Sequence, residues 1–283
     1  MGKTSIEWTD WSINPIRARR FGIHGSVGRG HYCEKIAPGC AHCYASALQH
    51  RFQMPEFGGQ ALRNNVDIFL DEAALKTVRS RQKSTRFFWC DMTDFYGDFI
   101  PQRYRQLCYE TMDFAWKHIH QVLTKRPGNI AKMWAPHTRD EEKHLYRDNV
   151  HLGTSISDQK TAAENIQLLM EARHWVPVLF LSVEPLLSEI DLRPWLASGD
   201  IDWVIIGGES GPHARPCNVG WVASLVTQCQ AAGVPCFVKQ LGTNRQSDGR
   251  SVLSPKLSGK GSQIEHFPEA LRVRQLPFFA EAE

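Results

Sequence analysis

The sequence lacks long apolar runs. Nowhere do about eighteen apolar residues follow one another without interruption, which is the length that a membrane-spanning helix needs. Residues 1–10 also lack the apolar core of a secretory signal peptide. The sequence therefore predicts no membrane partner and a cytoplasmic protein.

An excess of charge of one sign is lacking as well. Thirty-three basic residues stand against thirty acidic ones, and the formal net charge of +3 is too small to indicate a nucleic-acid or membrane partner by itself. Any such partner has to be inferred from a local site. A chain of 283 residues with 42% apolar and 22% charged residues has the composition of a globular protein with a sizeable core.

Eight cysteines are present, but a chain of this length builds a core without disulfides, so we expect reduced thiols. Five of the eight are scattered, as small buried apolar residues are. The other three lie within eleven residues of one another and indicate a shared role. The scattered five are Cys90, Cys108, Cys217, Cys229 and Cys236, and the clustered three are Cys33, Cys40 and Cys43.

From about residue 86 onward, short apolar runs alternate with stretches of helical period, which is the pattern of repeated βα units around a parallel sheet. Roughly eight strands favour an α/β fold with a complete or partial TIM-type barrel, in a single domain, over an open sheet. The predicted strands are 12–16, 66–70, 86–89, 119–123, 150–152, 178–181, 203–206 and 235–238, and the predicted helices include 103–117, 157–172 and 221–232.

Domain organisation follows from the same pattern. We expect a barrel domain over residues 1–242, with the cysteine loop at 31–44. Residues 243–283 begin with a stretch rich in Gly, Ser and Lys, which predicts an exposed loop, and end in a tail that packs on the barrel. The irregular stretch 17–31 is either a lid or a solvated insertion.

Polar residues follow nearly every predicted strand. Because the carboxyl ends of parallel strands meet at one face, we expect these side chains to share one mouth of the barrel. The segment after strand 203–206 is not a G-x-G-x-x-G fingerprint, so a Rossmann dinucleotide site is poorly supported. Its glycines would let backbone N–H groups approach a ligand. The strand-end residues are Asp91, Asp94, Lys125, Arg126, Thr154, Ser182, Glu184, Gly207, Gly208, Glu209 and Lys239.

Cys33, Cys40 and Cys43 form a loop that can bind one metal centre. On a 4Fe-4S cluster, three cysteine ligands leave the fourth iron open for a small molecule. A structural zinc site instead needs a fourth protein ligand. His42 lies between two of the cysteines and would point away from a metal that both of them bind, so it is the least convenient of the three candidate histidines. This favours iron–sulfur but leaves a Cys3His zinc site as a competitor. The candidate fourth ligands are His24, His31 and His42.

A series of short motifs carries a family resemblance from Thr4 to about Gly242. The motifs are Trp11-Ser12-Ile13-Asn14-Pro15, the cysteine loop with Tyr44-Ala45, Asp91-Met92-Thr93-Asp94-Phe95-Tyr96, Thr124-Lys125-Arg126-Pro127, Ser182-Val183-Glu184-Pro185-Leu186, Gly207-Gly208-Glu209-Ser210-Gly211-Pro212, Ala214-Arg215-Pro216 and Val238-Lys239-Gln240. In this order they resemble an uncharacterised family of phage and bacterial proteins, the phage Gp37/Gp68 type. That family is described as radical-SAM-like, nearest to the spore photoproduct lyase type.

The resemblance implies a 4Fe-4S cluster on the three clustered cysteines, with S-adenosylmethionine chelating the open iron. Two features depart from most radical SAM enzymes: six residues, not three, separate the first two cysteines, and the Gly-Gly-Glu element comes late in the chain. Asp91 or Asp94 is therefore the better candidate for the ammonium group of S-adenosylmethionine. The further cofactor-binding candidates are Thr154, Ser182, Gly207, Gly208 and Glu209, with Glu184 nearby.

Three functions follow from these residues. The first is an enzyme in which an electron donor reduces the cluster, a deoxyadenosyl radical forms, and basic strand ends hold an anionic substrate such as a nucleotide or nucleic acid. The second is a nucleic-acid-binding module stabilised by zinc or an inert cluster. The third is a phosphodiester hydrolase with Mg2+ or Mn2+ on the carboxylates. The candidate catalytic residues of the first are Lys125, Arg126, Glu184 and Lys239; Arg215 is a further anion ligand, and the sequence does not name a partner protein.

Overall fold

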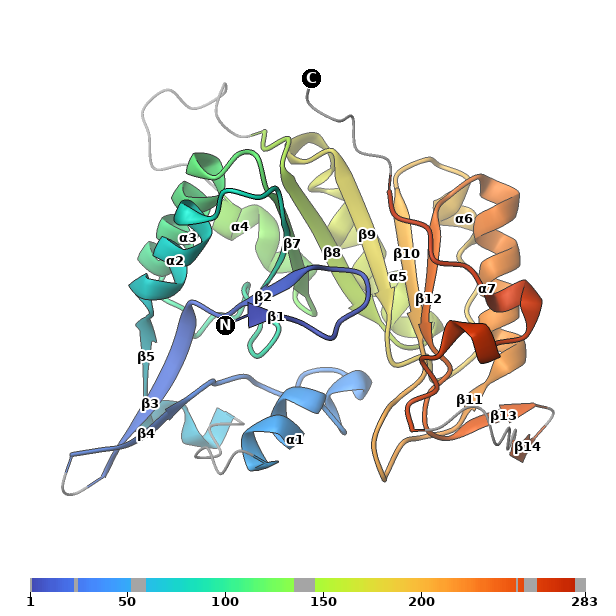
Figure 1. Cartoon of the computed structure of the whole chain (residues 1–283), viewed down its shortest axis with the longest axis horizontal. Helices are drawn as coiled ribbons and strands as arrows, with labels where there is room; N and C mark the ends of the chain where they lie inside the picture. The colour runs from blue at the N-terminus through green and yellow to red at the C-terminus, as the bar shows by residue number, and fades with distance from the viewer. Residues whose placement is uncertain are drawn as a thin grey trace. The chain divides into compact units, whose positions relative to one another are not determined.

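The computed structural model describes residues 2–22, 25–51, 60–134, 146–247, 249–251 and 259–277 (Figure 1). The chain forms two compact units. Unit 1 contains residues 1–153 and 171–177, and unit 2 contains residues 154–170 and 178–283. Both units are mixed α/β with mostly parallel main strands, which confirms the predicted fold class at that level.

Unit 1 is built on a row of strands in the order β1-β2-β6-β7. The β2–β6 and β6–β7 pairs are parallel, and β1 pairs with β2 antiparallel. These strands are β1 (Gly2–Lys3), β2 (Trp11–Ile13), β6 (Arg86–Trp89) and β7 (Ile119–Thr124), and the helices are α1 (Tyr44–Arg51), α2 (Glu72–Ser80), α3 (Gln102–Phe114) and α4 (Ile130–Trp134). Short 3-10 turns cover Pro38–Cys40, Gln60–Asn65, Pro127–Asn129 and Arg173–Trp175.

A second, three-stranded sheet in unit 1 lies in the order β4-β3-β5, with β3 (Ile16–Gly22), β4 (Gly25–Gly30) and β5 (Val66–Leu70). Both of its pairings are antiparallel. The predicted strand 66–70 therefore exists with its predicted bounds but belongs to this sheet and not to the parallel one. The stretch 17–31, predicted as a lid or a solvated insertion, contributes two of the three strands.

Alternation along the strands gives the parallel sheet of unit 1 two different faces. Trp89 Nε1 donates to His120 Nδ1 at 3.0 Å, and His120 Nε2 lies 3.3 Å from the Ala115 carbonyl oxygen just after α3. These side chains therefore face the helices. Phe88 points to the opposite face, where its ring centroid lies 4.7 Å from that of Trp8.

Unit 2 contains the parallel row β9-β10-β12, in which every residue but Lys239 is buried. Helix α7 contacts β10 and β12, and α5 contacts β9. The elements are α5 (Gln159–Met170), β9 (Val178–Val183), α6 (Arg193–Leu196), β10 (Trp203–Gly207), α7 (Val219–Ala232) and β12 (Cys236–Gln240), with the small strands β11 (Cys217–Asn218), β13 (Arg245–Ser247) and β14 (Arg250–Ser251) and 3-10 turns at Ile264–His266 and Glu269–Leu271.

Strand β8 (Val150–Ile156) is buried along its whole length, and it carries residues of both units. The observed strand is thus longer than the predicted run 150–152. Thr154, expected after the strand, lies inside it and is 0% exposed. Among the described helices, none combines the length and apolarity of a membrane span.

Candidate functional site

The cysteine loop connects β4 to α1 in unit 1. Cys40 ends a 3-10 turn that Pro38 begins, and Cys43 directly precedes α1. Cys40 is buried, whereas Cys33 and Cys43 are partly exposed. In the part of the chain that the structure describes, no three Cys, His, Asp or Glu side chains are gathered closely enough to hold a metal ion. Three thiols are the donor set of an iron–sulfur cluster, but cluster binding requires the loop to draw them together.

The three histidines considered as a fourth ligand differ in their surroundings. His31 is buried, and its Nδ1 lies 3.4 Å from the Ile16 carbonyl oxygen. Burial lowers the pKa of His31 to about 4, so the imidazole is neutral near pH 7. His42 is exposed on the loop, and His24 lies outside the described residues.

Cys33 is the thiol most closely connected to the predicted strand-end residues. Its Sγ donates to the Glu34 carbonyl oxygen at 3.8 Å. Burial raises the pKa of Cys33 to about 12, and the charges of Asp94 and Cys43 act in the same direction. The thiolate is the metal-binding form, so a bound cation has to offset this burial.

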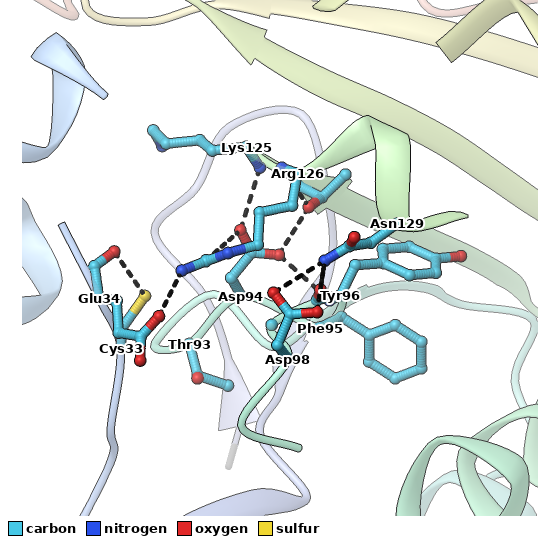
Figure 2. Close-up of polar contacts among 12 residues, drawn as sticks. Cys33, Glu34, Thr93, Asp94, Phe95, Tyr96, Asp98, Lys125, Arg126 and Asn129 are labelled. Atoms are coloured by element: carbon cyan, nitrogen blue, oxygen red, sulfur yellow. Dashed lines mark hydrogen bonds and ion pairs between the residues drawn. The ribbon is translucent and has the colours of Figure 1, made fainter. Parts of the chain in front are cut away.

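Asp94 follows β6 and is held by four donors (Figure 2). Its Oδ1 accepts from Thr124 Oγ1 at 2.6 Å and from the Tyr96 N–H at 3.1 Å. Its Oδ2 accepts from the Lys125 N–H at 3.1 Å and from Arg126 Nη1 at 3.2 Å. The Asp94 carboxylate is therefore engaged by hydrogen bonds from its own chain, and it positions the end of β7. The sequence instead suggested Asp94 as a ligand for the ammonium group of S-adenosylmethionine.

Arg126 connects this carboxylate to the cysteine loop. Its Nη2 lies 2.8 Å from Glu34 Oε2, while Nη1 binds Asp94, and its side chain is 9% exposed. Burial opposes the charged form, but Asp94, Cys33 and Glu34 together raise the pKa of Arg126. Lys125 differs, because its side chain extends away from the Asp94 carboxylate and only its backbone N–H binds there (Figure 2).

Asp91 forms a second connection to the cysteine loop. Asn14 Nδ2 donates to its Oδ1, and the hydroxyl of Tyr44, the residue after Cys43, donates to its backbone carbonyl oxygen at 2.6 Å. Cys90, just before it, has φ 59°, a left-handed conformation that non-glycine residues rarely adopt and that is concentrated at functional sites. Burial raises the pKa of Asp91, and the hydrogen bonds from Asn14 and Tyr44 partly oppose this effect.

The predicted residues of unit 2 form two ion pairs, Glu184 with Lys239 and Glu209 with Arg215. After β9, Glu184 Oε1 lies 3.0 Å from the Nζ of Lys239 on β12, and Ser182 Oγ donates to Glu184 Oε2 at 3.3 Å. The side chains of Glu184 and Lys239 are 15% and 17% exposed. Ser182, Glu184 and Lys239 thus form a cluster in which a hydroxyl, a carboxylate and an amine can exchange protons.

The Gly207-Gly208-Glu209 segment packs against other residues of unit 2. A Cβ at Gly207 would lie 2.5 Å from Glu184 Oε1, and one at Gly208 would lie 2.6 Å from the Leu241 carbonyl oxygen. Glu209 is buried, and its Oε2 accepts from the N–H and Nε of Arg215 at 2.8 and 2.9 Å. The glycines therefore make room for a carboxylate and a backbone crossing within unit 2.

Three contributors to the unit 1 site were not predicted. Glu34 is adjacent to Cys33 in sequence, and Asn14 and Tyr44 belong to motifs that carried no assigned role. The sequence separation of 92 residues between Glu34 and Arg126 explains why no local pattern pairs them. Unit 1 thus brings together Asp91, Asp94, Arg126 and the neighbours of Cys33 and Cys43, and unit 2 brings together Ser182, Glu184 and Lys239.

The fold and this site define an α/β protein with parallel strands and a three-cysteine loop anchored at strand ends. A family model described as "Protein of unknown function (DUF5131)" matches residues 3–268, and the chain belongs to this family. Neither the curated proteins nor the solved structures contain a significant match to the chain.

Proposed function

We propose that the protein is an iron–sulfur enzyme of the radical-SAM-like type, with a complete or partial barrel, that acts on an anionic substrate such as a nucleotide or nucleic acid. The observation that supports this most is the double anchoring of the cysteine loop. Glu34, next to Cys33, is paired with Arg126 at the end of β7, and Tyr44, next to Cys43, binds the Asp91 segment after β6. A loop anchored in this way holds its thiols beside the carboxyl ends of two parallel strands.

Cys33, Cys40 and Cys43 are the residues that would hold a 4Fe-4S cluster, and reductive cleavage of S-adenosylmethionine is the chemistry that such a cluster supplies. The chain's own residues bind and orient. Asp91 offers carboxylate oxygens to an ammonium group, and such a cation would offset the burial that raises the pKa of Asp91. Arg126 and Asp94 position the loop and the end of β7.

Each of the two units has its own basic candidate for binding an anion. In unit 1, Lys125 follows β7, and an ammonium group is a ligand for phosphate or carboxylate oxygens. In unit 2, Lys239 shares its charge with Glu184, so an incoming anion competes with that carboxylate. The Ser182 hydroxyl and Glu184 can then hold a proton next to an anion bound by Lys239.

The carboxylates favour this proposal over a metal-dependent phosphodiester hydrolase. Asp94 is paired with Arg126, Glu184 with Lys239, and Glu209 with Arg215. A divalent ion needs carboxylate oxygens converging on one point, and each of these carboxylates is turned toward a cation of its own unit. The zinc-module alternative gains no support from His31, whose ring lies against the Ile16 carbonyl oxygen.

Formation of 5′-deoxyadenosine tests the proposal. Anaerobically purified protein, reduced with dithionite and given S-adenosylmethionine, is expected to release 5′-deoxyadenosine, and Asp91→Asn should reduce the yield about tenfold or more. Lys160→Met is the matched surface control, since that side chain is 82% exposed. Iron-loaded protein that releases no 5′-deoxyadenosine with any nucleotide or nucleic acid present would refute the radical-SAM-like function.

A further inference from the structure

The C-terminal end of α3 in unit 1 carries the two most exposed large apolar side chains of the described residues. Phe114 ends α3 and Trp116 follows it by two residues, and both are 67% exposed. The other exposed large apolar side chains in the described part of the chain reach at most 54%. Aromatic rings are enriched where partners bind, so two rings this accessible indicate an interaction surface.

The loop from α2 to β6 lies beside the loop from α3 to β7. Ser84 Oγ donates to the Lys117 carbonyl oxygen at 2.9 Å, and Lys117 Nζ donates to Gln82 Oε1 at 3.4 Å. Helices α2 and α3, which precede the two loops, are also in contact (Figure 1). Residues 79–84 and 114–117 therefore form one surface, which we call the basic–aromatic surface.

Two arginines of this surface lie over aromatic rings. The guanidinium carbon of Arg79 is 5.7 Å from the ring centroid of Phe114, and that of Arg81 is 4.2 Å from the ring centroid of Trp11 on β2. Arg79 is also held by Thr111 Oγ1, which accepts from its Nε at 3.1 Å and from its Nη2 at 2.9 Å. The two planar guanidinium groups are therefore held in place, and such a group can stack on a base as well as bind a phosphate.

Positive charge exceeds negative charge on the basic–aromatic surface, which contains four cationic residues and no acidic one. The four are Arg79, Arg81, Lys83 and Lys117. Two carboxylates next to it are already paired, Asp10 with Arg86 at 2.8 Å and Asp113 with Arg147 at 2.7 Å. Glu110 is the other acidic residue of α3 and lies about one turn before its end. The excess of positive charge fits a polyanionic partner.

Exposed aromatic rings next to fixed cations suit single-stranded nucleic acid. The bases of a single strand stack on aromatic side chains, while Lys and Arg bind the phosphates between them. In a duplex the bases are stacked on one another, so exposed rings would have no base face to meet. A membrane partner would need a broader apolar face, and the only aliphatic residue of the surface, Ala115, is buried.

The basic–aromatic surface is separate from the cysteine loop. It lies where β6 and β7 begin, whereas Asp91 and Arg126, which anchor the cysteine loop, follow the ends of these strands. A strand of four residues, the length of β6, spans about 13 Å. Nucleic acid bound at this surface would therefore be held away from the proposed reaction site, without help from a cluster.

We propose that the basic–aromatic surface binds single-stranded nucleic acid, with its two exposed aromatic rings stacking on bases and its four cations binding phosphates. This role goes beyond the proposed function, because it assigns a second contact surface at the opposite ends of the strands. DNA and RNA share the bases and phosphates that the surface recognises.

Fluorescence anisotropy of a labelled single strand of about twelve nucleotides, as DNA and as RNA, measures binding to the full chain. Trp116→Ala should weaken binding at least about fivefold, because it removes a stacking ring. The Tm should stay that of the wild type, since this side chain is 67% exposed. Leu168→Ala, at an exposed apolar position of α5 in unit 2, is the control and should bind as the wild type does.

Salt dependence tests the cations separately. With four phosphate contacts to a single strand, the binding constant should fall about 50-fold between about 50 and 200 mM salt. Replacing Lys83 and Lys117 together by Gln should reduce this fall to about sevenfold. Lys160→Gln, whose side chain is 82% exposed on α5, should leave the salt dependence unchanged.

The proposal is overturned if neither DNA nor RNA binds, if Trp116→Ala binds as the wild type does, or if a duplex of the same sequence binds as tightly as the single strand. Trp116-dependent binding to vesicles of phosphatidylcholine and phosphatidylserine, without binding to either strand, would assign the surface to a membrane and overturn the proposal as well.

Iron analysis of the same preparations separates this inference from the proposed function. Trp116-dependent binding of a single strand by a chain that cannot be loaded with iron would refute the iron–sulfur function and leave the basic–aromatic surface standing. Iron-loaded protein that releases 5′-deoxyadenosine but shows no Trp116-dependent binding would refute the surface alone.

Discussion

Replacing Arg126 with methionine would remove the cation that two carboxylates share. The side chain of Arg126 is 9% exposed, and those of Asp94 and Glu34 are 8% and 18% exposed, so water cannot replace the lost partner easily. Breaking a buried ion pair from one side costs about 3–5 kcal/mol. Asp94 keeps three other donors, and Glu34 keeps the Tyr32 hydroxyl at 3.0 Å, so we expect the lower end, about 3 kcal/mol.

Differential scanning calorimetry measures this loss. At about 2–4 °C per kcal/mol for a chain of this size, Arg126→Met should lower the Tm by about 6–12 °C. Adding Glu34→Gln should restore part of the loss, because the second change neutralises one of the two stranded carboxylates. The double variant therefore measures how much of the cost arises from the pairing with the cysteine loop.

Arg193→Met is the matched control for this experiment. Arg193 and Asp191 make an ion pair with a similar distance, 2.7 Å, but their side chains are 73% and 44% exposed. Exposed pairs contribute little, so the Tm of this variant should stay that of the wild type. The reasoning fails if Arg126→Met lowers the Tm no more than Arg193→Met does.

Two further predictions concern stability. Gly208→Ala places a Cβ 2.6 Å from the Leu241 carbonyl oxygen, so calorimetry should show a loss of about 1–3 kcal/mol, and an unchanged Tm would contradict the backbone crossing. Burial lowers the pKa of His151 from its usual value of 6.5 to about 3. The stability that the neutral imidazole contributes is therefore fully present above pH 6.5 and is lost as the pH falls from 6.5 toward 3. His151→Leu should remove about 2 kcal/mol of the loss between pH 7 and pH 5, measured as the pH dependence of the Tm, and an unchanged pH dependence would contradict this reasoning.

Strand positions were predictable because buried parallel strands are short, apolar and rich in β-branched and aromatic residues. The run 86–89 has its predicted bounds, and 119–123 is one residue short. The pairing of the strands was harder to predict, because the composition of 66–70 indicates a strand but not which strand it pairs with. The hairpin of β3 and β4 was missed because its arginines and glycines hide any apolar alternation.

The candidate site was predictable only where the chain itself brings residues together. The spacing of the three cysteines and the polar residues after strands were visible in the sequence. The partner of each charged group was not, because Glu34 with Arg126 and Asn14 with Asp91 join distant segments.

The iron and acid-labile sulfide content of anaerobically reconstituted protein tests the central claim most directly. We expect about four of each per chain, a broad visible absorbance, loss of both in Cys40→Ala, and retention of both in Cys217→Ala, which changes a buried cysteine outside the loop. A colourless protein with one zinc per chain, or an unchanged spectrum in Cys40→Ala, would contradict the account.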